Sequence, residues 1–445
     1  IERSLVMAQD DTVGLSRLSL LSSVAEYARN KLSGCAQHSV QAAGIRHCRH
    51  YAQFGSQDYI SSLSKTGSVA RLWRLHGELE NLISGMDTAL ASDEADTAAQ
   101  CAIGAVIVLT KHGPFTQALT ILKRLSGCAI SPATQGQVFK YSGWVMKLSG
   151  HTSEAEAAYK KALVNAQQSG DTELQSTTLA WLGTLAREQG HTAQAEQHLD
   201  NALKIAQANG HTMPYQAALA YMAILKDEQG KLKEALSYYQ QAIDLARKHG
   251  NRAAEGTSTG NMANLYKEQG DFSIALKHYK DALEIVRQVG NRRSEATILA
   301  NTATIHQDMG ESAKALGYYT QALTVIRQTG EVRVEGITLG NIGNLLYAEG
   351  NFSSASDHLE QAISICDTVA PGAAGQFRAN LAIVRSEQGD FDEARTLLNG
   401  ARQQAASASR ITRGTIQCAS AKVEYLAGDT TAAAALHGPG PRRRT

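Results

Sequence analysis

Residues 260–290 read GNMANLYKEQGDFSIALKHYKDALEIVRQVG, and this stretch decides the fold. Glycine stands at positions 270 and 290, so it ends a segment of about 19 residues that lacks proline. Within that segment two alanines flank a tyrosine at offsets of four and three residues, which places all three on one helical face. Glycine after a helix adopts a left-handed conformation without strain and lets the chain reverse. The stretch therefore predicts two helices joined by a tight turn.

The same pattern recurs every 40 residues over six successive units. The turn glycines are Gly150, Gly190, Gly230, Gly270, Gly310 and Gly350, and the glycines halfway between them are Gly170, Gly210, Gly250, Gly290 and Gly330. The large apolar residue of each unit is Tyr159, Leu199, Tyr239, Tyr279, Tyr319 or Leu359, and the small residue on the other helix is Gly143, Gly183, Ala223, Ala263, Ala303 or Gly343. Small residues let two helices approach closely, while the large residue fills the gap between neighbouring units. The pattern therefore encodes the packing of helix pairs.

This arrangement of small, turn and large residues on paired helices resembles the tetratricopeptide repeat (TPR). The unit is longer than the family's usual length of about 34 residues, and glycine replaces the proline near the end of the second helix. The phrase LGNIGNLLYAEGNF (339–352) resembles the arrays of kinesin light chains, spindle-orientation adaptors and many bacterial signalling ATPases. The resemblance implies an all-α fold, a right-handed superhelical solenoid of antiparallel helix pairs, with a concave groove lined by the first helices.

The array is expected to cover residues 98–436, including degenerate units at both ends. Gly113, Gly389 and Gly428 mark the turns of these weaker units. A unit buries little apolar surface alone, so stacking supplies the stability and atypical terminal units act as caps. Residues 437–445 read HGPGPRRRT and have no helical pattern, so we expect a disordered basic tail.

Residues 1–97 do not follow the 40-residue period, and we expect a separate helical region there. Three amphipathic segments lie at 15–32, 46–54 and 72–90. They resemble the junction in bacterial regulators of the STAND signalling-ATPase type, where a winged-helix segment ends and the helical sensor begins. The resemblance implies a nucleotide-binding module upstream of Ile1 in a longer chain, since no G-x-x-x-x-G-K-[ST] loop occurs in this sequence. The alternative is a simple helical cap on the array.

Candidate ligand contacts lie on the first helix of each pair. Recurring asparagines suit the grip of an extended peptide backbone, because an amide both donates and accepts hydrogen bonds. Alternatively, the asparagines hydrogen-bond between adjacent repeats. Earlier repeats hold aromatic residues, which we expect to be exposed anchors, and basic residues that favour an acidic ligand. The candidate residues are Asn261, Asn264, Asn301, Asn341, Asn344, Tyr141, Trp144, Trp181, Tyr221, Lys140, Lys147, Arg187 and Lys267.

Composition limits the partner and the compartment. Lys and Arg total 43 against 42 Asp and Glu, so the chain has no overall field to attract nucleic acid or an anionic membrane. No apolar run approaches the ~20 residues that a membrane span needs, and we expect a cytoplasmic protein. Six cysteines without a close CxxC pair indicate buried free thiols in a reducing compartment.

Two patterns carry residue types used in catalysis or metal binding. Residues 256–260 fit the G-x-S-x-G string of a nucleophile elbow, but that motif needs a strand-to-helix turn and these residues align with a repeat helix. One cluster contains metal-ligand residue types, namely Cys35, His38, His47, Cys48 and His50. Its spacing matches no zinc template, and an amphipathic helix explains it better. We expect neither a catalytic residue nor a metal or other cofactor.

These observations predict a protein- or peptide-binding array that acts as the sensor or interaction module of a larger signalling regulator. The ligand lies in the concave groove, and this part of the chain binds neither nucleic acid nor membrane. One alternative is a free-standing scaffold or adaptor. Another is a metal-dependent enzyme that uses the Cys/His cluster near the amino terminus.

Overall fold

The computed structural model describes residues 6–10, 16–20, 31, 34, 37–65, 68–112, 114–125, 127–329, 332–404 and 410–437. They belong to two compact units. Unit 1 comprises the described residues of Ile1–Leu265 together with Gln288–Gly290, and unit 2 comprises those of Tyr266–Arg287 and Asn291–Thr445.

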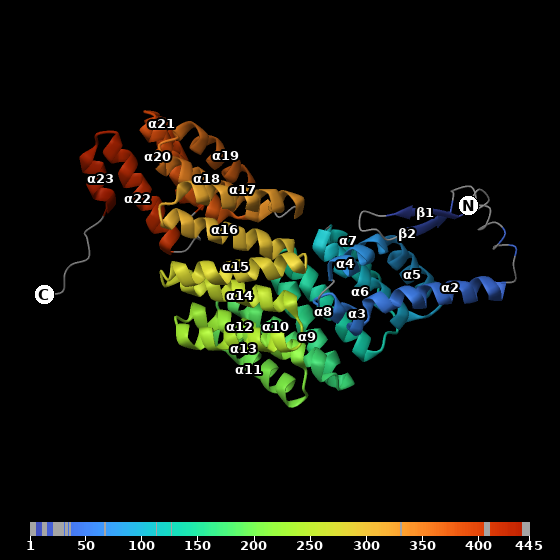
Figure 1. Ribbon diagram of the computed structural model, residues 1–445. Coiled ribbons are helices and arrows are strands. Elements are labelled where there is room, and N and C mark those ends of the chain that lie inside the picture. Colours follow the sequence, from blue (N-terminus) through green and yellow to red (C-terminus); the bar gives the residue numbers. More distant parts are fainter. Residues whose placement is uncertain are drawn as a thin grey trace. The chain divides into compact units, whose positions relative to one another are not determined.

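Helices make up nearly all of both units (Figure 1). Unit 1 contains α2 (Gln37–Ala52), the short 3-10 helix η1 (Gln53–Gly55), α3 (Gln57–Ser62), α4 (Ser68–Gly77), α5 (Leu79–Ala91), α6 (Ala95–His112), α7 (Phe115–Arg124), α8 (Pro132–Leu148), α9 (Thr152–Ser169), α10 (Thr172–Glu188), α11 (Thr192–Ala208), α12 (Thr212–Glu228), α13 (Leu232–Lys248) and most of α14 (Arg252–Glu268). Unit 2 contains α15 (Phe272–Gln288) except its last residue, α16 (Arg292–Asp308), α17 (Ser312–Thr329), α18 (Val332–Ala348), α19 (Phe352–Val369), α20 (Pro371–Glu387), α21 (Phe391–Gln404), α22 (Arg410–Leu426) and α23 (Thr430–His437).

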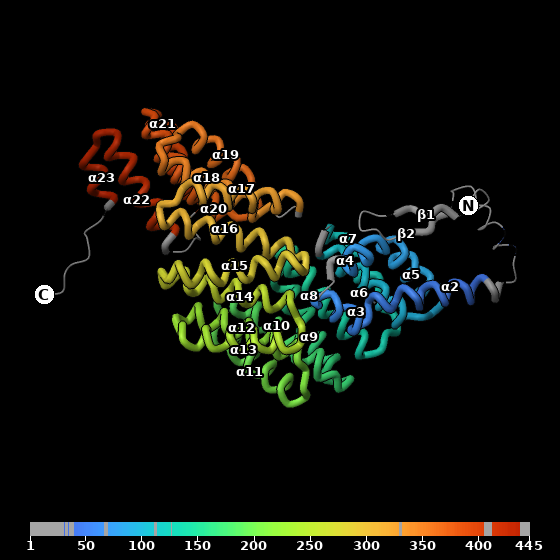
Figure 2. The backbone as a smooth tube through the Cα atoms, in the orientation of Figure 1, coloured from blue at the N-terminus to red at the C-terminus, as the bar shows by residue number. Residues whose placement is uncertain are grey.

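The helices pack as successive pairs. In unit 1, α8 packs with α9, α10 with α11 and α12 with α13, while in unit 2, α16 packs with α17, α18 with α19 and α20 with α21. The backbone reverses direction at the turn within each pair (Figure 2). The predicted all-α fold of antiparallel helix pairs is therefore confirmed. Among the described helices, none combines the length and the hydropathy that crossing a bilayer requires.

The region before residue 98 differs from the helical expectation in one respect. Strands β1 (Val6–Asp10) and β2 (Ser16–Leu20) form an antiparallel pair in which Val6 lies opposite Leu20. β2 lies near the start of the segment 15–32, where Leu18, Ser19 and Leu20 alternate between apolar and polar types with the period of two of a strand. The helices α2 to α5 follow, as expected for the rest of the region.

Left-handed glycines make the turns that the spacing predicted. The described turn glycines of both series have φ between 65° and 82°, a conformation that costs a residue with a Cβ about 1–2 kcal/mol. Gly389 and Gly428 have φ values of 92° and 86°, so the degenerate units turn in the same way. Gly113, Gly330 and most of the basic tail lie outside the described residues.

Each pair is held together where a large side chain of the second helix fits against a small residue of the first. A Cβ built on Gly183 would lie 2.7 Å from Leu199 Cγ and 3.2 Å from the carbonyl oxygen of Ala195. A Cβ on Gly343 would meet Leu359 Cγ at 2.7 Å in the same way. The large residues at this position are all buried, with no more than 3% of any of them exposed. The notch that the small residue leaves therefore sets how closely the two helices approach.

Replacing the notch glycine tests this fit. Gly183→Ala should lower the free energy of unfolding by about 1–2 kcal/mol, because overpacking against Leu199 outweighs the better helix propensity of alanine. Gly317→Ala is the matched control, since a Cβ at this exposed helical position meets nothing within 4 Å. The control should raise stability by up to about 1 kcal/mol. Urea unfolding followed by circular dichroism measures both, and equal gains for the two variants would contradict the tight notch.

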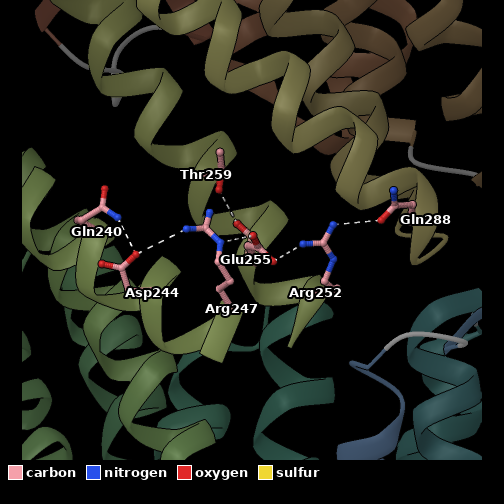
Figure 3. A network of polar contacts seen from close by, with 7 residues as sticks. All are labelled: Gln240, Asp244, Arg247, Arg252, Glu255, Thr259 and Gln288. Atoms are coloured by element: carbon pink, nitrogen blue, oxygen red, sulfur yellow. Dashed lines mark hydrogen bonds and ion pairs between the residues drawn. The ribbon is translucent and has the colours of Figure 1, made fainter. Parts of the chain in front are cut away.

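A buried glutamate that pairs with two arginines joins consecutive helix pairs, and we call this arrangement the arginine clamp (Figure 3). Glu255 on α14 is 2% exposed and receives Arg247 Nε at 3.2 Å and Arg252 Nη1 at 2.5 Å. Arg252 also donates to Gln288 Oε1 at 3.1 Å, so one carboxylate connects the end of α13, the start of α14 and the end of α15.

Unit 2 contains a second copy of the arginine clamp. Glu295 is 3% exposed and accepts from Arg287 Nε at 2.8 Å and Arg292 Nη1 at 2.7 Å. Burial alone would raise the pKa of Glu295, but the hydrogen bonds from the two arginines outweigh it, and the pKa is lowered overall. A carboxyl group with a lowered pKa in the folded state contributes stability above its unfolded pKa, and that stability is lost as the pH falls through the folded value.

The clamp therefore predicts an acid-sensitive contribution to stability. Glu295→Gln should cost about 1–2 kcal/mol at pH 7, because a charge-assisted pair becomes a neutral one next to two half-exposed arginines. The difference from the wild type should shrink as the pH falls below about 4.5, where the unfolded carboxyl begins to bind protons. Thermal unfolding at several pH values measures this, with the exposed Glu349→Gln as control. A pH-independent difference would contradict the lowered pKa.

Candidate functional site

All candidate residues lie on the first helices of the pairs, as the sequence predicted, but the two units divide them. Unit 1 holds the aromatic residues and most of the basic ones, on α8, α10 and α12. Asn261 and Asn264 lie on the part of α14 that belongs to unit 1, whereas Lys267 and the asparagines of α16 and α18 belong to unit 2.

Four aromatic side chains form a contiguous strip across three first helices, and we call Tyr141, Trp144, Trp181 and Tyr221 the aromatic wall. The ring centroids of Tyr141 and Trp144 are 6.1 Å apart, and those of Trp144 and Trp181 are 6.0 Å apart. The indole N–H of Trp181 donates to the hydroxyl of Tyr221, so the strip continues onto α12. Burial raises the pKa of Tyr221, whose phenol stays protonated as the acceptor.

The expected exposure holds for only part of the aromatic wall. Trp144, Trp181 and Tyr221 are half-buried, so each keeps a surface for contact. Tyr141 is 5% exposed because it packs in the apolar cluster with Val138 and Val145, and it is not a surface anchor. The aromatic wall therefore has three side chains that a ligand can contact, and the buried Tyr141 packs beside them.

The basic residues next to the wall are neutralised within the chain. Lys147 Nζ lies 2.9 Å from Glu188 Oε1, and Arg187 contacts both Glu188 and Glu228. From the sequence alone, Lys147 and Arg187 are expected to add positive charge that favours an acidic ligand. Glu188 and Glu228 offset this charge, so the rim is a neutral row of ion pairs.

Lys140 differs from these two cations because it is buried. It is 5% exposed, and its Nζ lies 4.5 Å from the ring centre of Tyr141 and 5.9 Å from that of Trp181. Among the described residues it forms neither a hydrogen bond nor an ion pair. Burial lowers the pKa of Lys140 to about 8, against the opposing charges of Glu173 and Asp171.

The asparagines of unit 2 bind other parts of the array. Asn301 donates to the hydroxyl of Tyr279, and Asn341 donates to that of Tyr319. Asn344 Oδ1 accepts from Asn380 Nδ2 at 2.8 Å, which joins α18 to α20. The alternative that the asparagines connect adjacent repeats therefore accounts for these contacts. The tyrosine hydroxyls were not predicted as partners, although tyrosine and asparagine recur together 22 residues apart in the sequence.

A pocket of about 370 Å³ lies among α9, α10 and α11. It is lined by Leu163, Gln167, Gln175, Leu179, Gln197, His198, Asn201, Lys204 and Ile205. Burial lowers the pKa of His198, followed by the charge of Lys160, which favours the neutral imidazole. None of the predicted site residues lines this pocket, and the repeat pattern gave no sign of it because its amides occupy positions outside the packing motif.

The structure describes all of the G-x-S-x-G string at 256–260 but only part of the Cys/His cluster near the amino terminus. Ser258 is 3% exposed within the continuous helix α14, so residues 256–260 form no nucleophile elbow, as predicted. Cys48 is buried, and its thiol donates to the carbonyl of Ile45 at 3.2 Å. The described part of the chain contains no group of three or more His, Cys, Asp or Glu placed to hold a metal, while Cys35 and the side chain of His38 lie outside it.

The cysteines fit the expectation of buried thiols only in part. Cys48, Cys101 and Cys366 are buried, and burial raises the pKa of each, in Cys101 to about 12. Cys128 is half-buried and Cys418 is exposed on α22. All five are free thiols.

The paired helices, left-handed turns and notch packing define a helical-repeat protein of the TPR type. The family described as MalT-like TPR region matches residues 148–330 and 255–437, which together cover more than half of the chain. The chain therefore belongs to the MalT-like TPR region family.

Solved structures share the fold at low sequence identity. A Signal Transduction ATPase with Numerous Domains (STAND) protein with a tetratricopeptide repeat sensor, from Pyrococcus horikoshii, is 16% identical with a TM-score of 0.55, over 81% of this chain and 51% of that one. The apo form of the quorum sensor NprR from B. thuringiensis is 14% identical with a TM-score of 0.53, over 74% of this chain and 97% of that one. The chain thus spans about half the length of the STAND protein. No curated protein matches it.

Lys140 predicts a pH dependence in the alkaline range, with the same sign as that of the clamp in the acid range. Its pKa is about 8 in the folded chain against 10.5 ordinarily, so the unfolded chain binds more protons between these values and stability rises with pH. Relative to Lys140→Met, the wild type should gain about 3 kcal/mol across this window. Urea unfolding of both proteins from pH 7 to pH 10.5 measures the difference. Parallel stability profiles would mean that Lys140 is not desolvated.

Proposed function

We propose that the aromatic wall of unit 1 binds an extended peptide segment of another protein. The observation that carries this proposal is the strip of half-buried aromatic side chains on three consecutive first helices. Large rigid aromatic residues supply contact area at little entropic cost, and they dominate binding energy at protein interfaces. The packed helices beneath hold them in place before the ligand arrives, which reduces the cost of ordering.

The spacing of the wall suits one face of an extended chain. Alternate residues of a strand lie about 6.6 Å apart on the same side. The rings of Trp144 and Trp181 are 6.0 Å apart, so successive aromatic rings can meet ligand residues two positions apart. The neutral ion pairs of Lys147, Arg187, Glu188 and Glu228 form a polar rim that offers both donors and acceptors to the peptide backbone.

We further propose that the array is the sensor part of a larger bacterial regulator of the STAND type, with a nucleotide-binding module upstream in the full-length chain. The segments before residue 98 resemble the junction in such regulators, and the antiparallel pair β1–β2 suits the end of a winged-helix segment. The Pyrococcus protein of the same fold carries a TPR sensor on a signalling ATPase. In this role the chain is a cytoplasmic, non-enzymatic binding module. A scaffold or adaptor without the upstream module is the alternative, and the sequence of the complete gene decides between them.

Peptide selection tests the proposed site directly. Random twelve-residue peptides displayed on phage should yield binders to the full chain, and binding should change tryptophan fluorescence because two of the three tryptophans lie in the wall. Trp144→Ala should weaken these binders by at least about tenfold, as expected for an interface anchor. Tyr425→Ala, which removes a 67% exposed aromatic residue of unit 2, is the matched control.

The result discriminates between surfaces. Binders that are unaffected by Trp144→Ala, while the variant keeps the melting temperature of the wild type, would place the ligand elsewhere. Failure to select any binder, with folded protein on the matrix, would remove peptide binding as the function of this wall.

A further inference from the structure

Lys140 occupies a position that is small in the other first helices. The equivalent residues, 40 or 39 positions apart along the array, are Ala180, Ala220, Gly260, Ala300, Gly340 and Ala379. A small residue here leaves room for the next first helix, since a Cβ on Gly340 would lie 2.2 Å from the ring of Phe377. Lys140 therefore places a long charged side chain at a position where the other repeats have only alanine or glycine.

A second buried lysine shows how this chain neutralises such a charge. Lys226 on α12 is also 5% exposed, but its Nζ lies 2.5 Å from Glu196 Oε1 and 3.4 Å from Glu234 Oε2. For Lys140, the ammonium contacts within the described residues are the rings of Tyr141 and Trp181. A buried charge is costly unless it is paired, so the missing counter-ion is the unusual feature.

The nearest carboxylates are committed to other donors. Glu173 Oε1 accepts from Gln57 Nε2 at 3.3 Å, and Asp171 Oδ1 accepts from the backbone N–H of Leu174 at 2.8 Å, where it caps α10. They influence the charge of Lys140 from a distance without pairing with it.

An orphaned hydroxyl lies on the facing helix. Thr178 Oγ1 is buried on α10 and has no hydrogen-bond partner in the part of the chain that the structure describes. Thr178 is the repeat equivalent of Phe377, just as Lys140 is the equivalent of Gly340, so the contact between Gly340 and Phe377 indicates that Lys140 faces Thr178. Within the described part of the chain, Lys140 Nζ and Thr178 Oγ1 are thus two donors without a polar partner, on neighbouring first helices beside the aromatic wall. A carboxylate accepts several hydrogen bonds and supplies the missing negative charge.

We propose that Lys140 and Thr178 receive a carboxylate of the peptide bound on the aromatic wall. The inference rests on the proposed function and names the ligand as a peptide with an acidic group beside an apolar or aromatic residue. The ammonium group reaches this carboxylate at the half-exposed edges of Trp144 and Trp181, because four flexible methylene groups carry it. The carboxylate is either the chain terminus or an Asp or Glu side chain.

Matched ligands and variants test the proposal. Peptides selected on the full chain are synthesised with a free terminal carboxylate, with a terminal amide, and with each Asp or Glu replaced by Asn or Gln. The wild type should bind one acidic form at least about tenfold more tightly than its neutral counterpart. Lys140→Met should abolish that preference, while Thr178→Val should reduce it. Lys160→Met on α9, an exposed lysine paired with Glu156, should keep the full preference.

A small probe keeps this test separate from that of the proposed function. N-acetyl-leucine should shift the indole NMR signals of Trp144 and Trp181, assigned with Trp→Phe variants, and N-acetyl-leucinamide should shift them far less. The carboxylate-specific shift should vanish in Lys140→Met. Equal shifts by acid and amide, or a shift that survives in Lys140→Met, would overturn the carboxylate site even if peptides bind. A carboxylate-specific shift without any selected peptide would support the site and reject the peptide.

Discussion

The structure depends on one steric constraint, the fit of a large side chain into the notch left by a small one. Gly183 receives Leu199, and Gly343 receives Leu359, at distances that leave no room for a methyl group. Because the interiors of proteins pack as densely as organic crystals, this fit sets the distance between the helices of a pair. The distance between the two helices of a pair also determines the positions of the other side chains on the first helix. The aromatic wall adjoins this packing directly, since the ring centroids of Trp181 and of the notch residue Tyr159 are 5.6 Å apart.

Sequence predicted the fold well because packing leaves a periodic signature. The turn glycines, the alanines and the large residue opposite the notch each recur at a fixed spacing, so one unit is checked by five others. The strands β1 and β2 fall in a stretch without a repeat, where only a short alternation of apolar and polar residues was available. Prediction was strong where the chain repeats itself and weaker where it does not.

The site was harder to predict because it depends on contacts between residues far apart in sequence. Periodicity placed every candidate on a first helix but said nothing of its partner. Lys147 and Arg187 were recognised as basic, whereas their neutralisation by Glu188 and Glu228 needs the packing of neighbouring helices. Sequence likewise cannot distinguish Lys140 from Lys226, since the partners of Lys226 lie on other helices. The asparagines recur regularly, and this regularity suggested contacts with a ligand. In the structure, Asn301, Asn341 and Asn344 form hydrogen bonds within the array instead.

The arginine clamp has a further consequence for how the array can diversify. Glu255 and Glu295 brace the central joints, but the equivalent residues at the starts of α10 and α12 are Gln175 and Tyr215. Gln175 Nε2 donates to the carbonyl oxygen of Ala166 at 3.1 Å, so a neutral hydrogen bond takes the place of a charged clamp between α9 and α10. Small adjustments of these helices break no charge pair of this kind. The helices that carry the candidate site, α8, α10 and α12, can therefore best tolerate substitutions. The arginine clamps at Glu255 and Glu295 preserve the packing of the later helices.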